Sequence, residues 1–201
     1  GLIEYIQHAV LTWGREQHGD FEGRFAPFPA PQLGPWLRTH RTKSARIMLV
    51  SGIVPFLPTR LISNGELHCH GRLKDRVEFI AALEPALQHK LLYRPYPQRV
   101  YGAEDSAYFK RLFPDVEQIG DQLRFFHEMR RCRLLVVDHP GLTLYQALAA
   151  GPPFVGYWTD LQWPMDDAVK PIFDDLRRAG VLFDDAEDAA IALSERWDRT
   201  E

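Results

Sequence analysis

The chain has 201 residues and a formal net charge of −3; 45% of its residues are hydrophobic and 25% are charged. These are ordinary values for a globular protein, and the net charge predicts neither a nucleic-acid partner nor attraction to an anionic membrane. No apolar run is long enough to span a bilayer. The two cysteines, Cys69 and Cys132, lie far apart and match no metal motif. We therefore expect a reducing, cytoplasmic setting, with the inner face of the membrane as an alternative.

The first 42 residues differ in character from the rest. Residues 1–8 are predicted to form a strand, and a strand at the first residue suggests a piece of a longer protein. Residues 9–42 are rich in Gly, Pro, Trp and Phe and are predicted to be irregular. A connection of this length is uncommon unless it is functional or crosses between domains. We expect residues 1–42 to be a crossing segment from a missing or truncated N-terminal domain, and residues 43–201 to be a second domain.

From residue 46 onward, predicted strands alternate with predicted helices. The strands are short aliphatic runs, and Gly or Pro marks the ends of several helices. Strands are predicted at 47–52, 90–97, 114–119, 134–137, 154–157 and 181–183, and helices at 73–87, 106–113, 120–131, 144–150, 166–179 and 185–197. This alternation predicts an α/β fold with a Rossmann-like, doubly wound parallel sheet.

The most informative turn follows the predicted strand 134–137. Its sequence is Asp-His-Pro-Gly-Leu-Thr, residues 138–143, and a helix-forming segment comes next. A strand–turn–helix corner of this type points free backbone N–H groups toward the carboxyl edge of the sheet, where a phosphate can bind. The alternative is an ordinary corner in which Asp138 and Thr143 only cap the helix. His139, Pro140 and Gly141 favour the ligand site, because open α/β sheets place ligands at this edge.

Several motifs resemble a known family. The chain has Gln-His at 7–8, Tyr-Arg-Pro-Tyr-Pro at 93–97, the turn at 138–143, and Pro-Pro-Phe-Val at 152–155 followed by Tyr-Trp. In this order they resemble the C-terminal half of a GT-B glycosyltransferase. More narrowly, they resemble bacterial surface-carbohydrate transferases related to the capsule Kdo transferases and the CDP-glycerol-type polymerases. The resemblance runs through most of the chain.

The resemblance implies a role in bacterial surface polysaccharide biosynthesis. Residues 43–201 would bind a nucleotide-sugar donor, CMP-, UDP- or GDP-linked, and the acceptor would be a glycan or a lipid-linked glycan. The catalytic base or nucleophile would lie in the N-terminal domain. No metal or cofactor is implied, since a helix dipole and basic side chains can stabilise the departing phosphate.

The chain departs from the family pattern at two positions. Ala9 stands where the family usually has Gly after Gln-His, which changes how closely the backbone can approach a substrate. Gln146 stands where many GT-B enzymes place a Glu on the donor ribose. An amide still hydrogen-bonds a diol but supplies no charge.

Two histidines are the candidate catalytic residues. The resemblance makes His8 a candidate for acceptor binding or acid/base chemistry, and we expect it to face an interdomain cleft. His139 could donate to a phosphate or leaving-group oxygen near neutral pH. For both residues the alternative is a structural histidine, satisfied in the case of His139 by a neighbouring carbonyl.

The candidate donor-binding residues cluster at predicted strand ends. Arg94 precedes Pro95, and its guanidinium would suit a phosphate at the carboxyl edge. The alternative is a surface Arg that pairs with Asp115 or Glu117. The full predicted set is Gly52, Arg94, Asp138, His139, Pro140, Gly141, Leu142, Thr143 and Gln146.

Other functions are less well supported by the sequence. His68-Cys69-His70 could place two imidazoles on one side of a strand, but no further cluster completes a metal site. A nucleotide-sugar epimerase of the same fold would need a pair of acid/base carboxylates, and no convincing pair is present. A non-enzymatic flavodoxin-like binding domain would need an acidic cluster after the first strand, where the chain has Val50-Ser51-Gly52.

Overall fold

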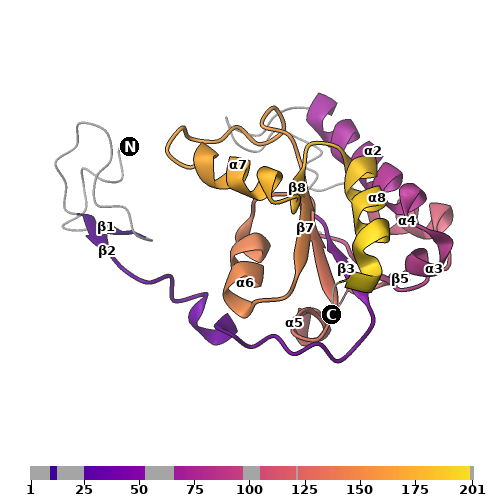
Figure 1. Ribbon diagram of the computed structural model, residues 1–201, viewed down its shortest axis with the longest axis horizontal. Helices are drawn as coiled ribbons and strands as arrows, with labels where there is room; N and C mark the ends of the chain where they lie inside the picture. Colours follow the sequence, from indigo (N-terminus) through magenta and orange to yellow (C-terminus); the bar gives the residue numbers. More distant parts are fainter. Residues whose placement is uncertain (1–9, 13–24, 53–65, 97–104, 121, 200–201) are drawn as a thin grey trace.

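The computed structural model describes residues 10–12, 25–52, 66–96, 105–120 and 122–199. Its centre is a six-stranded, wholly parallel sheet (Figure 1). In the spatial order β5-β4-β3-β6-β7-β8, the strands are Glu117–Gln118, Leu91–Arg94, Ile47–Val50, Leu134–Val137, Phe154–Tyr157 and Leu182–Phe183. Numbered along the chain, this order is 3-2-1-4-5-6, which is the order of the Rossmann fold. The predicted doubly wound α/β fold is confirmed.

Helices cover both faces of the sheet, because the crossover connections between its parallel strands contain them. Strands β3, β4 and β6 are buried at every position. Alternate side chains of each strand enter two separate cores, as the period of two in a strand requires. Ile47, Leu91 and Leu134 enter the core that holds Phe79 and Leu193, whereas Met48, Leu92 and Leu135 enter the core that holds Phe125 and Leu144. Burying each such aliphatic side chain contributes roughly 1.5–3 kcal/mol.

The helices follow the strands along the chain. Their bounds are α2 Glu66–Ala82, α3 Pro85–Gln88, α4 Asp105–Leu112, α5 Gln122–Met129, α6 Leu142–Ala150, α7 Lys170–Arg178 and α8 Ala186–Arg196. Asp185 caps α8 and accepts hydrogen bonds from the N–H groups of Glu187 and Asp188. Gly151, with φ of 91°, ends α6. Gly151 ends its helix as the sequence predicted, whereas Asp185, predicted as the first helical residue, is the N-cap.

Two predicted helices differ from the observed ones by more than two residues at one end. The predicted helix 73–87 begins earlier than predicted, at Glu66. It is also divided into α2 and α3, because Pro85 disfavours helical backbone at the residue before it, and Glu84 has an extended ψ of 140°. The predicted helix 166–179 begins only at Lys170, because the Asp166 carboxylate accepts from the N–H of Ala168 and closes a turn instead.

The described residues of the first 42, which are 10–12 and 25–42, are less irregular than predicted. Val10–Thr12, strand β1, pairs in parallel with Phe25–Pro27, strand β2, and a 3-10 helix, η1, covers Gly34–Trp36. Figure 1 shows the β1–β2 pair standing apart from the six-stranded sheet. The connecting segment reaches the sheet along the ends of α6 and α5, where Trp36 is buried against Phe126. The predicted strand 1–8, which includes His8, and Ala9 lie outside the described residues.

Candidate functional site

The candidate site lies at the carboxyl ends of β3 and β6, the two neighbouring central strands. After β3 the chain turns to α2 on one face of the sheet, and after β6 it turns to α6 on the other face. Such a switch point leaves a crevice beyond the strand ends, where open α/β sheets bind ligands. The residues that end these strands are Ser51-Gly52 and Asp138-His139.

Asp138 and His139 form a hydrogen-bonded pair at this point. Asp138 Oδ1 accepts from the backbone N–H of Gly52 at 2.6 Å and lies 2.9 Å from His139 Nδ1. Because an ionised carboxylate can only accept, Nδ1 carries the proton that joins the two side chains. The other ring nitrogen, Nε2, is therefore a proton acceptor in the neutral ring and a donor in the imidazolium.

Two glycines provide the space that the His139 ring occupies. A Cβ added to Gly52 would lie 2.8 Å from His139 Cγ, and one added to Gly141 would lie 2.5 Å from both Cδ2 and Nε2. Both distances are far below van der Waals contact. The imidazole is thus held between the end of β3 and the start of α6, with 14% of its side chain exposed. The predicted site residues Gly52, Asp138, His139 and Gly141 are brought together.

The start of α6 has no side-chain cap within the described part of the chain. Its N-cap is Gly141, and neither Asp138 nor Thr143 bonds to the first-turn N–H groups there. The structure therefore does not support the interpretation of Asp138 and Thr143 as helix caps; Asp138 is held instead by Gly52, His139 and Arg76. The N–H of Leu144 donates to the Gly141 carbonyl at 3.0 Å; the other first-turn N–H groups and the helix dipole make this end of the nine-residue helix attractive to an anion.

A fully buried arginine, which the sequence analysis missed, supports the pair from α2. Arg76 Nε donates to Asp138 Oδ2, Nη1 donates to Asp105 Oδ2 at 2.9 Å, and Nη2 donates to the carbonyl of Gly52 at 2.6 Å. The Tyr93 hydroxyl also donates to Asp105, at 2.7 Å. These side chains come from helices α2 and α4, strand β4 and the turn after β6, which lie far apart in the sequence. Only the tertiary fold shows that Arg76, one of several arginines in its region, lies in the core.

The buried charges shift one another's pKa values in opposite directions. Burial alone raises the pKa of Asp138, but the Arg76 guanidinium and the hydrogen bond from His139 outweigh it and hold the pKa well below its usual range. For Asp105, burial outweighs the attraction of Arg76 and the hydrogen bond from Tyr93, so its pKa is raised. Burial lowers the pKa of Arg76, but this effect is outweighed by the nearby Asp138, Tyr93 and Asp105, so the pKa of Arg76 is raised. Asp138 is thus a permanent anion near neutral pH and orients His139.

The loop after β7 forms a wall beside His139. Trp163 lies 6.0 Å from the His139 ring, centroid to centroid, and the Arg72 guanidinium lies over the Trp163 ring at 4.2 Å. Gln162 Nε2 donates to Asp75 Oδ2 at 2.5 Å and ties the loop to α2. Arg72, Asp75 and Arg76 are spaced i, i+3, i+4, so one face of α2 serves the site. That spacing was the available sequence signal for this face.

The remaining predicted residues occupy different positions. Arg94 is buried, stacks over Phe125 at 5.2 Å, and donates from Nη1 to the carbonyls of Pro95 and Ile119. Arg94 is therefore not the surface arginine that the alternative interpretation expected. The binding of a phosphate by Arg94 stays a prediction. The other three lie along the same turn and helix: Pro140 and Thr143 are half-buried, and Leu142 is 41% exposed.

Gln146 is buried, one turn further into α6 than the others. Its proposed contact with a ribose stays a prediction. No group of three or more metal-ligating side chains occurs among the residues that the structure describes. Cys132 is buried, and burial raises the pKa of its thiol to about 12, as expected for a packing residue. His68, Cys69 and His70 lie in helix α2 and not in a strand, and their side chains are outside the described set.

Fold and site together define an α/β protein with a Rossmann strand order and a histidine–aspartate pair at the topological switch point. The chain belongs to the LIC12162 family transferases: the model of that family matches residues 2–201. No curated protein matches the chain. Among the described residues, no helix is both long and apolar enough to cross a membrane.

Proposed function

We propose that this transferase moves a glycosyl group and binds its nucleotide-sugar donor at the carboxyl edge of the sheet. The observation that carries the proposal is the position of His139, held by Asp138 beside the uncapped start of α6. The resemblance to the C-terminal half of GT-B glycosyltransferases supports the choice of donor. By the same resemblance, the acceptor is a glycan or lipid-linked glycan of the bacterial surface.

The proposed chemistry assigns His139 and α6 to the leaving group. When the bond between the sugar C1 and the phosphate oxygen breaks, negative charge develops on the departing phosphate. The imidazolium donates to it from Nε2, and the first-turn N–H groups of α6 stabilise the rest of the charge. Asp138 stabilises the imidazolium through Nδ1. The structure favours this electrostatic role because Asp138 is anionic and already oriented.

The acceptor must lose a proton to another group. Asp138 is a poor base for this step, since its pKa is held low and its two oxygens accept from Gly52, His139 and Arg76. We assign acceptor activation to a group outside the described residues, and His8 remains the candidate from the sequence.

The two alternative functions fit less well. An epimerase needs two carboxylates free to exchange protons with the sugar ring. Asp138 and Asp105 do lie close together, but both are buried and bonded to Arg76. A flavodoxin-like domain has the strand order 2-1-3-4-5, whereas this sheet has 3-2-1-4-5-6.

Titration of the full chain with CMP, UMP, GMP, UDP and GDP by calorimetry tests the donor site. We expect at least one nucleotide to bind, and His139→Ala to weaken it about tenfold or more, since a charged hydrogen bond to phosphate contributes roughly 1.5–3 kcal/mol. Arg94→Lys tests the predicted phosphate contact in the same titration. His89→Ala is the matched control, because His89 is an exposed histidine that is distant in sequence from His139.

Absence of binding by all five nucleotides at millimolar concentration to the folded chain would refute the donor site. Unchanged affinity in His139→Ala would remove His139 from it. If Arg94→Lys lowers the melting temperature and leaves affinity intact, Arg94 has only the packing role that its buried position shows.

A further inference from the structure

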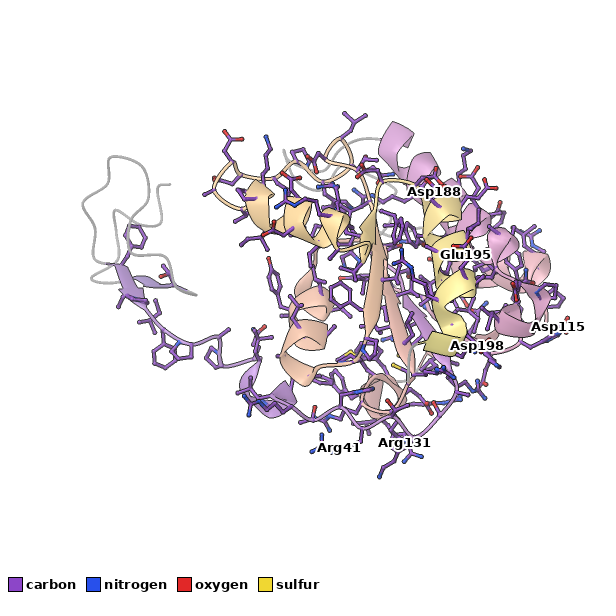
Figure 2. The ribbon with its side chains drawn as sticks, in the orientation of Figure 1. Arg41, Asp115, Arg131, Asp188, Glu195 and Asp198 are labelled. Carbon is purple, nitrogen blue, oxygen red and sulfur yellow. The ribbon has the colours of Figure 1, made fainter. Side chains whose placement is uncertain are left out.

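The opposite edge of the sheet carries a dense group of basic side chains. Residues 38–46 and 130–133 hold seven basic residues and no acidic one. Backbone hydrogen bonds join the two segments: Arg41 N–H donates to the Arg130 carbonyl at 2.9 Å, Lys43 N–H to that of Arg131 at 3.0 Å, and Arg133 N–H to that of Arg46 at 2.9 Å. We call this set the basic strip: Arg38, Arg41, Lys43, Arg46, Arg130, Arg131 and Arg133. Figure 2 shows Arg41 and Arg131 at this end of the molecule.

Most of the positive charge on the basic strip is not neutralised. Arg46 pairs with Glu117. The guanidinium of Arg41 donates instead to the carbonyls of Arg38 and His40, and that of Arg130 donates to the carbonyl of Pro35. Within the part of the chain that the structure describes, no carboxylate pairs with five members of the strip, namely Arg38, Arg41, Lys43, Arg130 and Arg131. Two carboxylates reduce the excess without cancelling it: Glu128, two residues before Arg130, and Asp198, next to Trp197, whose carbonyl accepts from Arg133.

An apolar groove borders the basic strip. It has a volume of about 460 Å³ and is lined by Pro152, Pro153, Phe154, Val181 and Leu193, with Arg196 at its polar side. The strip reaches the groove because the His40 N–H donates to the carbonyl of Ala150, next to Gly151 in the groove wall. Leu37, beside Arg38, is 63% exposed. Apolar surface next to unpaired cations is the pattern of a surface that contacts lipid.

We propose that the amino edge of the sheet docks on an anionic phospholipid bilayer. The unpaired cations of the basic strip would face the lipid phosphates, and Leu37 and the groove would contact the acyl boundary. A nucleic acid would use the cations but would leave the groove and Leu37 in water, so the observations favour lipid. The net charge of the chain does not reveal this surface, because acidic residues elsewhere offset its positive charge. Residues 160–188 alone carry nine acidic and only three basic side chains.

The docking surface is separate from the donor site. The basic strip lies at the amino ends of the strands and His139 lies at a carboxyl end, so a docked molecule would keep its crevice turned away from the lipid. Vesicle binding and nucleotide binding can therefore succeed or fail independently of each other.

Vesicle flotation with the full chain tests the proposal. We expect binding to phosphatidylcholine vesicles containing about 30% phosphatidylglycerol, little binding to pure phosphatidylcholine, and weakening as salt is raised. Replacing Arg41, Lys43 and Arg131 together by Ser should weaken binding about a hundredfold, at about fivefold for each basic side chain. The control replaces Lys74, Lys110 and Arg178 by Ser, which changes net charge equally at other surfaces. Circular dichroism melts confirm that both variants fold.

Three results would overturn the proposal. The first is no binding to the anionic vesicles at about 0.1 M salt. The second is an equal loss in the control variant, which would make the attraction a matter of net charge. The third is binding of a single-stranded RNA oligonucleotide, sensitive to the strip and insensitive to Leu37→Ser, with no vesicle binding; the surface would then be a nucleic-acid site.

Discussion

The two edges of the central sheet treat charge in opposite ways. At the carboxyl edge, Arg76 is completely buried and is bonded to Asp138 and Asp105. At the amino edge, five cations of the basic strip have no carboxylate partner within the described residues. Water stabilises an exposed cation without a partner, but a buried one must be paired. The comparison shows that arginine has two uses in this protein. A buried arginine fixes the geometry of the candidate site, and exposed arginines contribute to the proposed docking surface.

The largest expected effect comes from removing the buried cation. Arg76→Met would leave Asp138 and Asp105 in the interior without their partner, and breaking such a pair typically costs about 3–5 kcal/mol. We expect the free energy of unfolding in urea to fall by that amount. Arg178→Met, which breaks only an exposed pair with Asp175, should change it by less than about 1 kcal/mol. If both variants lowered the free energy of unfolding equally, the distinction between buried and exposed cations would be wrong.

The second effect concerns the space reserved for His139. Gly141→Ala should cost about 1–3 kcal/mol of stability or displace the imidazole, because the new Cβ would overlap the ring. The same change in a His139→Ala background should cost much less, which a double-mutant cycle measures. Gly120→Ala is the control, since nothing lies within 4 Å of its added Cβ. An additive cycle would mean that Gly141 serves another purpose.

The third effect is a pH dependence with a defined sign. The pKa of Asp138 is lower in the folded chain than in the unfolded chain, so its stabilisation is complete above the unfolded pKa near about 4 and is lost as pH falls toward the folded value. Below about pH 4 this loss has a slope of up to about 1.4 kcal/mol per pH unit. Asp138→Asn should have a flatter stability profile in this range, measured by urea unfolding.

Asp105 provides the opposite sign. Its raised pKa means that the folded chain binds a proton first, so acid adds stability between the folded and unfolded pKa values. Asp105→Asn should remove that gain and make the acid loss steeper than in the original chain. Identical profiles for the three proteins would contradict the coupling of these carboxylates to Arg76.

The smallest expected effect lies at the amino edge. Replacing Arg41 and Lys43 by Ser should change the free energy of unfolding by less than about 0.5 kcal/mol, because both side chains are exposed. The guanidinium of Arg41 bonds only to exposed carbonyls among the described residues. Thermal melts at low and high salt measure this. A clear gain in stability would show that the cations of the basic strip repel one another strongly, unlike the paired Arg76 at the carboxyl edge.

The sequence was sufficient for the order of strands and helices and for part of the site. Runs such as 134–137 are apolar throughout, and Gly151 and Asp185 mark helix ends, so local chemistry reveals them. It failed at Glu84, where the effect of Pro85 on the preceding residue was overlooked, and at β1 and β2, whose pairing connects separate segments.

By itself the sequence determined a parallel α/β fold and a polar turn at Asp138–His139, because both depend on residues close together along the chain. The tertiary structure alone decided that Arg76 joins Asp138 to Asp105, and that two distant basic segments form one strip. It also placed Arg94 in the interior, with its guanidinium on backbone carbonyls. The physical reason is that the burial and partners of a charge depend on which segments the fold brings together, and composition averages over all of them.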